Sequence, residues 1–364
     1  MKPVTKSMKG VYLNGHGGFD KIEFNENIPL PILKNNEVLI KIHAAGVNNT
    51  DINTRIAWYS KNNISGNNTK LASEGMLSRV NNDGSWSGQG IEFPRIQGID
   101  GCGKIVDVGS AVNKSRVGER VLINPCMKIK NSYFFLGSEI NGCFAEYTKV
   151  QSEFALKINS KLSSDELATF PCSYSTAENM LNRTRLLKNE KVLITGASGG
   201  VGSACIQLAS LRSAKIIAVT NINKKQQIKK INSGMTINYD EIKTISDNSV
   251  DVVIDLLGGN FSNILISKLK KFGRYATAGA VTGPIADIDL RTIYLQDLKL
   301  FGCTVLDDNI FKNLISFFEK NKIKPLLARS FPLNNMVEAQ KFFLEKNFLG
   351  KVVISICNSD KSKL

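Results

Sequence analysis

Hydrophobic and polar residues alternate in the first third of the chain, with the period of half-buried strands. In the segment 36–42, Val38, Ile40 and Ile42 fall on one face, because every second side chain of a strand points to the same side of its sheet. The segments 101–109 and 117–123 have the composition of two strands joined by a turn. Short strands at close spacing predict a small barrel or sandwich in this part of the chain.

The hydrophobic pattern changes after about residue 160, where strand-like and helix-like segments alternate. Ser163 and Glu166 have the spacing of a capping box at the start of a helix. We expect strands over 191–195, 215–220, 250–256, 273–278, 299–305 and 351–356, and helices from 203 and over 224–231, 261–271, 309–319 and 335–345. Strands that alternate with helices are typical of an α/β protein with a doubly wound parallel sheet.

The segment 60–90 breaks the strand pattern. It has 31 residues, of which 17 are Asn, Ser or Gly, and it shows no sustained period. A long loop inside a compact domain is usually functional or disordered. Trp58, Tyr59 and Trp86 lie in or beside this segment, where they could cap a substrate pocket or pin the loop to the surface.

A glycine-rich turn between a predicted strand and a predicted helix is the strongest local motif. Such a turn lets the backbone approach a pyrophosphate closely, and the helix N-terminus then presents free N–H groups to the phosphates. Ala197 occupies the first glycine position of the strict motif, but the strand–turn–helix context is kept. The predicted cofactor-binding residues of this turn are Ala197, Ser198, Gly199, Gly200, Val201 and Gly202.

The end of the next predicted strand indicates which dinucleotide binds. An NAD site usually places Asp or Glu there to hold the ribose 2′-hydroxyl. This chain has Thr220 at that position, with Lys224 and Lys225 shortly after it. A 2′-phosphate meets no repelling carboxylate there and has cations beside it, so we predict NADPH as the cofactor, unless these lysines only begin a solvated helix.

Charge and cysteine content narrow the classes of partner and compartment. The chain has 47 Lys and Arg against 32 Asp and Glu, a formal charge of +15, but the basic residues are spread out and no nucleic-acid motif is present, so a nucleic-acid partner is not expected. No apolar run is long enough for a membrane span, and residues 1–7 lack a signal-peptide core.

Seven scattered cysteines without a CxxC pair favour reduced thiols and a cytoplasmic location. The chain ends Ser362-Lys363-Leu364, which also matches a peroxisomal address.

Several short motifs, in this order along the chain, carry a family resemblance. They lie at 45–51, 98–103, 196–202, 237–239, 273–275 and 350–353. With them, the chain resembles the medium-chain dehydrogenases/reductases, on the branch of the zinc-free quinone oxidoreductases. The resemblance covers nearly the whole chain.

The resemblance implies two domains and a cleft between them. The expected fold is α/β: a GroES-like β-barrel catalytic domain over 1–160, completed by the tail 325–364, plus a Rossmann doubly wound parallel sheet over 161–324. The nicotinamide would meet the barrel in the cleft. Besides the glycine-rich turn, the expected cofactor-binding residues are Thr176, Thr220, Lys224, Tyr239, Gly279 and Lys351.

The same comparison argues against a catalytic zinc. The alcohol dehydrogenase branch places Cys, His and Cys where this chain has Asn48, Ile99 and Cys172. Isoleucine cannot bind a metal, so two of three ligands are lost, and we predict no metal. Without a Lewis acid to polarise a carbonyl group, oxidation of a simple alcohol is difficult. Reduction of an electron-poor quinone or activated alkene is easier.

The predicted catalytic residues are Asn48, Asp51 and Tyr59. Asn48 could donate a hydrogen bond to the oxygen that gains charge, and Tyr59 or solvent could supply the proton. Asp51 could instead form only a structural ion pair with Arg55 at a spacing of four residues.

The leading prediction is thus an NADPH-dependent, zinc-independent oxidoreductase acting on a small electrophilic molecule. A zinc-dependent alcohol dehydrogenase and a non-catalytic RNA-binding protein with the NADPH fold are the alternatives. By analogy with the family we expect a homodimer through the edge strand near 299–305.

Overall fold

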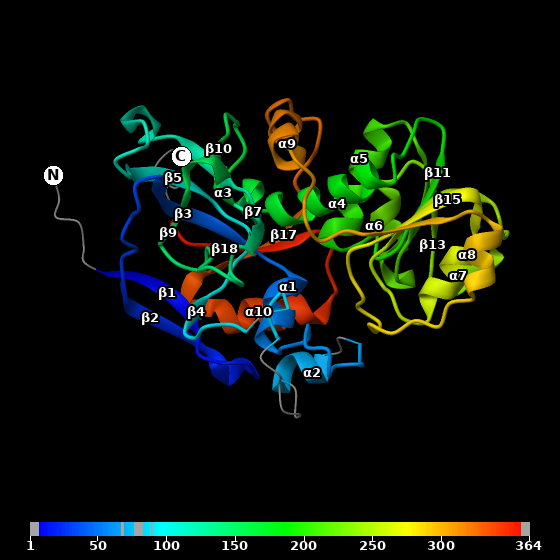
Figure 1. The fold of residues 1–364 in the computed structure, drawn as a ribbon, viewed down its shortest axis with the longest axis horizontal. Helices are drawn as coiled ribbons and strands as arrows, with labels where there is room; N and C mark the ends of the chain where they lie inside the picture. The colour runs from blue at the N-terminus through cyan, green and yellow to red at the C-terminus, as the bar shows by residue number, and fades with distance from the viewer. Residues whose placement is uncertain (1–6, 67–68, 76–82, 89, 358–364) are drawn as a thin grey trace.

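The computed structural model describes residues 7–66, 69–75, 83–88 and 90–357. Two groups of strands lie at opposite ends of the molecule, joined by helices (Figure 1). The N-terminal and C-terminal segments share one group, and the middle of the chain forms the other. The boundaries expected at 160/161 and 324/325 stay predictions.

Strand β3 (Glu37–Val47) is the centre of the first group. Its alternating residues Val38, Ile40 and Ile42 are all fully buried, as the sequence pattern predicts. The sheet has the order β10-β6-β5-β3-β18-β17, and β9 also pairs with β3. The C-terminal β18 (Lys351–Ser355) runs antiparallel to β3, with Val353 opposite Gly46, so the tail contributes to the sheet that the N-terminal part begins.

The other strands of this group are β1 (Ser7–Leu13), β2 (Ile22–Pro29), β4 (Arg95–Ile96), β5 (Cys102–Val108), β6 (Arg120–Ile123), β7 (Cys126–Ile129), β8 (Ser132–Phe135), β9 (Tyr147–Gln151), β10 (Ala155–Lys157) and β17 (Leu327–Pro332). Its helices are α1 (Asn49–Arg55), α2 (Thr69–Glu74) and α10 (Met336–Glu345). Helix α2 lies inside the segment 60–90, for which the sequence indicated no element. Short 3₁₀ turns lie at Phe19–Lys21, Lys114–Arg116, Ser152–Phe154, Ile222–Lys224, Asp240–Thr244 and Leu333–Asn335.

The second group is a six-stranded sheet with the order β13-β12-β11-β14-β15-β16. All five of its strand pairs are parallel, so the predicted parallel sheet is confirmed. The strands are β11 (Lys191–Ile194), β12 (Lys215–Val219), β13 (Met235–Ile237), β14 (Val250–Asp255), β15 (Leu269–Thr277) and β16 (Lys299–Gly302). The helices are α4 (Pro171–Arg183), α5 (Gly200–Leu211), α6 (Lys225–Lys229), α7 (Phe261–Ser267), α8 (Leu290–Leu295) and α9 (Ile310–Glu319). The short helix α3 (Ser164–Leu167) packs against β3, β5, β17 and β18 of the first group.

Several element boundaries in this part of the chain differ from the sequence prediction: for example, β15 begins at Leu269 rather than at 273, and β16 ends at Gly302 rather than at 305. Helix α5 begins at Gly200 rather than at 203, so the glycines themselves form its first turn. Helix α7 ends at Ser267, and the residues predicted as its last turn open β15. Leu269 is buried in this sheet, and burial of that side chain favours strand over a further helical turn.

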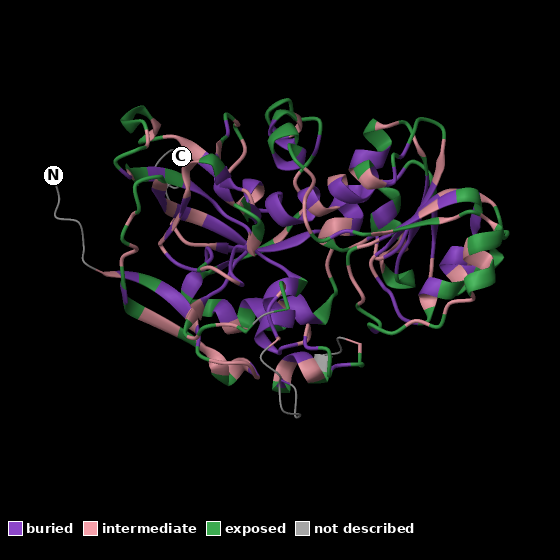
Figure 2. Cartoon of the chain, in the orientation of Figure 1, coloured by how far each residue is buried: buried purple, intermediate pink, exposed green. Residues whose placement is uncertain are grey.

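The core follows the sheets and the helices between them, as the buried residues in Figure 2 show. Helix α4 connects the two groups of strands. Phe170 at its start stacks on Phe318 of α9, with ring centroids 4.1 Å apart. Within the described part of the chain, no helix is long and apolar enough to cross a membrane.

Candidate active site

The glycine-rich turn joins β11 to α5 as the sequence predicts. Gly196 has a φ of +59°, a left-handed conformation that side chains disfavour. A Cβ at Gly202 would collide with the carbonyl oxygen of Gly196, so helix and strand can approach this closely only through glycine. Ala197 is fully buried, whereas Gly199 is exposed and has free space around it. The turn therefore leaves an open cradle at the helix N-terminus, with Ser198 and Val201 on either side of the two central glycines.

Thr220 directly follows β12 and has a buried hydroxyl with no partner among the described residues. A buried polar group without a hydrogen bond is costly, so this hydroxyl fits a ligand group better than an apolar surrounding. Lys225 is paired with Glu241 at 2.7 Å. Lys224 instead donates to the carbonyl oxygen of Lys346, and burial lowers its pKa. The residues present thus fit a dinucleotide that carries extra negative charge.

Lys346 is a residue of this cradle that the sequence analysis missed. It follows α10 in a left-handed conformation with a φ of +52°, and its ammonium donates to Asn49 Oδ1 at 2.9 Å. Burial lowers its pKa to about 7, and the charges of Lys224 and Lys351 add to the effect. Three cations from two distant parts of the chain, Lys224 and the tail residues Lys346 and Lys351, lie near one another here, an arrangement that favours a bound anion.

The other predicted cofactor-binding residues lie around the same cradle. The Thr176 hydroxyl interacts with the Cys172 thiol one turn earlier on α4. Tyr239 packs against Phe261, with ring centroids 5.8 Å apart. Gly279 follows β15, and a Cβ there would lie 3.2 Å from the carbonyl oxygen of Leu256. Their contacts with a cofactor stay predictions.

Asp255 at the end of β14 holds this edge of the sheet together. Its carboxylate accepts hydrogen bonds from the Thr195 hydroxyl at 2.8 Å and from the backbone of Leu257 at 2.9 Å. The Tyr275 hydroxyl donates to the same carboxylate. The network fixes the carboxyl ends of three neighbouring strands, the place where ligands bind in such sheets.

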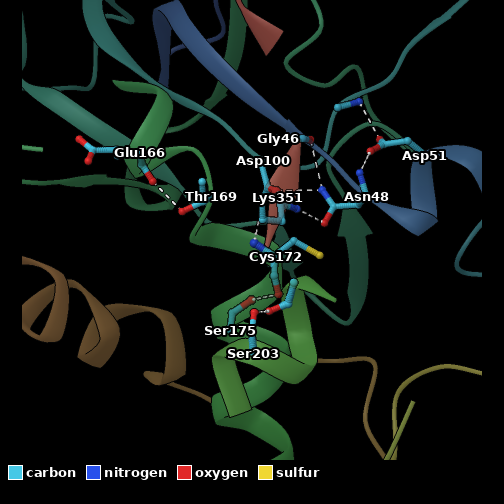
Figure 3. A network of polar contacts seen from close by, with 12 residues as sticks. Gly46, Asn48, Asp51, Asp100, Glu166, Thr169, Cys172, Ser175, Ser203 and Lys351 are labelled. Atoms are coloured by element: carbon cyan, nitrogen blue, oxygen red, sulfur yellow. Dashed lines mark hydrogen bonds and ion pairs between the residues drawn. The ribbon is translucent and has the colours of Figure 1, made fainter. Parts of the chain in front are cut away.

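The second half of the site is a buried polar cluster centred on Asn48 (Figure 3). Asn48 follows β3 at the start of α1, and Asp100 precedes β5. Asp100 Oδ2 accepts from Asn48 Nδ2 and from Lys351 Nζ, each at 2.8 Å, while Asp100 Oδ1 accepts from the backbone N–H of Cys172 at 2.6 Å. A Cβ at Gly46 would collide with the same carboxylate, which explains the glycine in the motif at 45–51.

The amide of Asn48 is oriented by charge on both sides. Its Oδ1 accepts from the Lys351 ammonium, and its Nδ2 donates to Asp100 and, at 3.2 Å, to Gly46 O. Turning the amide over would set oxygen against carboxylate and NH₂ against ammonium. Both N–H groups are therefore engaged, and the geometry does not support the expected donation from Asn48 to a substrate oxygen.

Asp51 caps helix α1. Its carboxylate accepts from the backbone N–H of Asn48 at 2.8 Å and from that of Gly98 at 3.2 Å. Burial, with Asp100 nearby, raises its pKa to about 7. The suggested ion pair with Arg55 is wrong: the guanidinium donates to Gln340 Oε1 and to the carbonyl oxygens of Gly17 and Ala72 instead.

Tyr59 lies beside the polar cluster. Its hydroxyl interacts with the side chains of Thr50 and Asn53, and burial raises its pKa to about 12, so it is protonated at neutral pH. Its ring is parallel to that of Trp86, which stacks on Phe135 at 4.5 Å. The aromatic rings of Tyr59, Trp86 and Phe135 therefore lie in a row next to the site, and the role of Tyr59 as a proton donor stays a prediction.

The donor set at the centre does not fit a metal. Ile99 is buried and has no ligand atom, and the Asn48 amide is already bonded on both sides. Burial raises the pKa of the Cys172 thiol, which disfavours the thiolate that zinc needs. Among the described residues, no group of three or more His, Cys, Asp or Glu could hold a metal ion. No catalytic step is therefore derived through zinc.

Comparison with known proteins agrees with this architecture. Residues 34–160 match the alcohol dehydrogenase GroES-like domain, and residues 200–320 match a domain described as zinc-binding dehydrogenase. A solved structure from Sinorhizobium meliloti, described only as a candidate alcohol dehydrogenase, is 38% identical with a TM-score of 0.86, over 98% of this chain and 99% of that one. The chain belongs to the medium-chain dehydrogenase/reductase superfamily.

Two curated members of the superfamily are similar over almost the whole chain. The NADPH-dependent alkenal/one oxidoreductase of Arabidopsis thaliana chloroplasts is 26% identical, over 96% of this chain and 80% of that protein. The human quinone oxidoreductase is also 26% identical, over 96% of this chain and 98% of that protein. The expected GroES-like and Rossmann parts of the fold are thus confirmed.

Proposed function

We propose that the protein is an NADPH-dependent, zinc-independent oxidoreductase that transfers a hydride to a quinone or an activated alkene. The observation that carries the proposal is the pairing of two sites. An unpartnered hydroxyl and a group of lysines adjoin the glycine cradle, and beside them lies a buried polar centre whose donor set does not fit a metal. Relatives named as alkenal/one and quinone oxidoreductases support this class of acceptor.

The residues divide the work of the reaction between them. When bound, NADPH supplies the hydride. The free backbone N–H groups in the first turn of α5 would receive its pyrophosphate, and Thr220 and Lys224 its ribose end. The protein's task at the other end is to hold the acceptor against the nicotinamide and to stabilise the charge that appears on its oxygen. Tyr59 or solvent would then supply the proton.

NADPH consumption by chelator-treated protein tests the proposal, with an ortho-quinone and a short enal offered separately. We expect turnover that is unchanged by 1,10-phenanthroline, and the better acceptor identifies the substrate class. Turnover that disappears with the chelator and returns with Zn²⁺ would support the zinc-dependent alternative. Salt-dependent RNA binding without any turnover would support the non-catalytic alternative.

We further propose a homodimer and a cytoplasmic location. All seven cysteines lie in described residues and are free, which supports a reducing compartment. The residues Ser362, Lys363 and Leu364 lie outside the described part of the chain, so the peroxisomal address stays a prediction. Exposed apolar side chains near the edge strand β16 support the dimer.

A further inference from the structure

We infer that Lys351 is the electrophilic group of this active site: its ammonium, fixed by Asp100, stabilises the negative charge that develops on the acceptor oxygen during hydride transfer. The inference rests on the proposed function and deepens it, because it names the group that acts where the metal ligands are missing. It also changes the expected role of Lys351 from binding the cofactor to contacting the substrate.

The first support is the position of Lys351. A Cβ at Gly200 would lie 2.8 Å from Lys351 Cδ, so the aliphatic stem crosses the first turn of α5, in the cofactor cradle. The ammonium at the end of the side chain lies in the polar cluster around Asn48, 2.8 Å from Asp100 Oδ2. One side chain thus bridges the cradle and the centre, the place where the acceptor must lie next to the nicotinamide.

The second support is the count of hydrogen bonds. An ammonium has three N–H groups, and two of them go to Asn48 Oδ1 and Asp100 Oδ2. Among the described residues no acceptor takes the third. Asn48 has no donor left, and burial keeps the neighbouring Cys172 thiol neutral by raising its pKa. Lys351 is therefore the charged donor of this cluster that can still bind a ligand.

The third support is burial. The side chains of Lys351 and Asp100 are 5% and 0% exposed. A charge held in such surroundings acts more strongly on a nearby oxyanion than it would in water. Asp100 fixes the ammonium in place before the substrate arrives, so little reorganisation is needed during the reaction.

The step balances without another reactant. The hydride adds to the β-carbon of the activated alkene, the electron pair of its C=C bond moves toward the carbonyl carbon, and the C=O electron pair becomes an enolate oxyanion. Lys351 donates a hydrogen bond to that oxygen and keeps its proton. The α-carbon then takes a proton from solvent or Tyr59, and the cofactor leaves oxidised. With a quinone, the same two electrons produce the hydroquinone monoanion.

The first experiment measures the charge of the site without turnover. 4-Nitrophenol, titrated into the NADP⁺-loaded protein, reports by its absorbance whether the phenol or the phenolate is bound. We expect the wild type to prefer the phenolate and Lys351→Met to lose that preference by about tenfold or more. Lys268→Met is the matched control, because Lys268 is also buried and paired, with Asp247 at 2.6 Å, but lies between α7 and β15, away from the polar centre.

Removal of Lys351 alone leaves the buried Asp100 unpaired, so the single variant can fail to fold. The double variant Asp100→Asn with Lys351→Met removes both charges, so no buried charge is left without a counter-ion, and it is the second test. Lys351→Arg keeps the charge and should retain the phenolate preference. A phenolate preference in the folded double variant equal to that of the wild type would overturn the inference.

Kinetics separate an electrophile from a structural tie. For a series of aryl enones with electron-donating to electron-withdrawing groups on the carbonyl side, we expect Lys351→Met to lower kcat most for the electron-rich members. An equal loss for every member, with the phenolate preference kept, would mean a structural role and contradict the inference. If the wild type reduces no acceptor but its phenolate preference still depends on Lys351, the proposed function fails while the assignment of the charged donor stands.

Discussion

Lys346 Nζ donates a 2.9 Å hydrogen bond to Asn49 Oδ1 and so ties the segment after α10 to the first turn of α1. The same ammonium lies over the ring of Phe343, 3.4 Å from its centroid. These contacts hold the Lys346 side chain beside the cofactor cradle, and neither of them is an ion pair. A bound phosphate would supply the missing negative charge.

The pKa of Lys346 predicts how cofactor affinity changes with pH. Its value of about 7 results from burial and from the charges of Lys224 and Lys351. Because a lysine is charged below its pKa, this cation is present at pH 6 and largely lost at pH 9. We expect the Kd for NADPH to rise about tenfold over that range, the effect of losing roughly 1.4 kcal/mol. Titration calorimetry measures it, and Lys346→Met should flatten the dependence; parallel curves for the two proteins would contradict this role.

Lys224 should set the preference for NADPH over NADH. Its ammonium donates to the carbonyl oxygen of Lys346 and has no carboxylate partner among the described residues, whereas its neighbour Lys225 is paired with Glu241. A charge-assisted hydrogen bond to phosphate contributes about 1.5–3 kcal/mol. We therefore expect Lys224→Ala to weaken NADPH binding about tenfold or more and to leave NADH binding nearly unchanged, as fluorescence titration would measure.

Lys225→Ala is the matched control for that experiment. This variant also removes one positive charge, only one residue from Lys224, but the Lys225 ammonium is already paired with Glu241. It should therefore change the affinities for NADPH and NADH little. Equal losses of NADPH affinity in the two variants would mean that the net charge of this surface, and not a contact of Lys224, determines the preference.

Local patterns in the sequence predicted most of the fold. The alternation at Val38, Ile40 and Ile42 marks one face of β3, and the glycines at 196–202 mark the strand–turn–helix unit. Both signals lie within a few residues, because strand period and turn chemistry are local properties. The predicted end of α7 is too late in the sequence, because Leu269 pairs with Val250 of β14 and does not continue the helix.

The polar centre could be predicted only in part, because its contacts join distant segments. Lys351 and Asp100 are separated by 251 residues, and no spacing rule relates them. Asn48 was identified by its position, but the direction of its amide depends on those two charges. Lys346 gave no sequence signal either: it resembles any solvated lysine until the fold brings it to Asn49.

Asp51 should prove to be a capping residue and not an acid or base. Its carboxylate is used by two backbone N–H groups, so we expect Asp51→Asn to keep kcat within a few-fold of the wild type, measured once the variant is shown to be folded. An essential general acid or base would cost about 10²–10⁴ in rate, and a loss of that size would contradict the capping role.

The pH dependence of stability offers a second test of Asp51. Burial raises its pKa from the usual value of 3.8 to about 7, so the folded state binds more protons than the unfolded state between these values. Stability from this group is therefore greatest at low pH and falls as the pH rises toward 7. Denaturant unfolding should show that the unfolding free energy of the wild type falls relative to that of Asp51→Asn as the pH rises through this window. A difference that stays constant with pH would mean that Asp51 titrates normally.

The edge of the parallel sheet predicts the assembly of the protein. Strand β16 ends the strand order, and an unpaired edge is a ready site for another strand. Large apolar side chains that are 42% to 69% exposed gather on and before it, at Ile285, Leu290, Tyr294, Leu295 and Leu300. Such a patch is typical of an interface, and two copies related by a twofold axis would cover both edges at once.

We expect sedimentation to give about twice the chain mass of 40.0 kDa, and a Tyr294→Glu, Leu295→Glu variant to sediment as a monomer. Ile32→Glu, at a position that is 87% exposed outside this patch, should remain a dimer; a wild type that sediments as a monomer at micromolar concentration would exclude this interface.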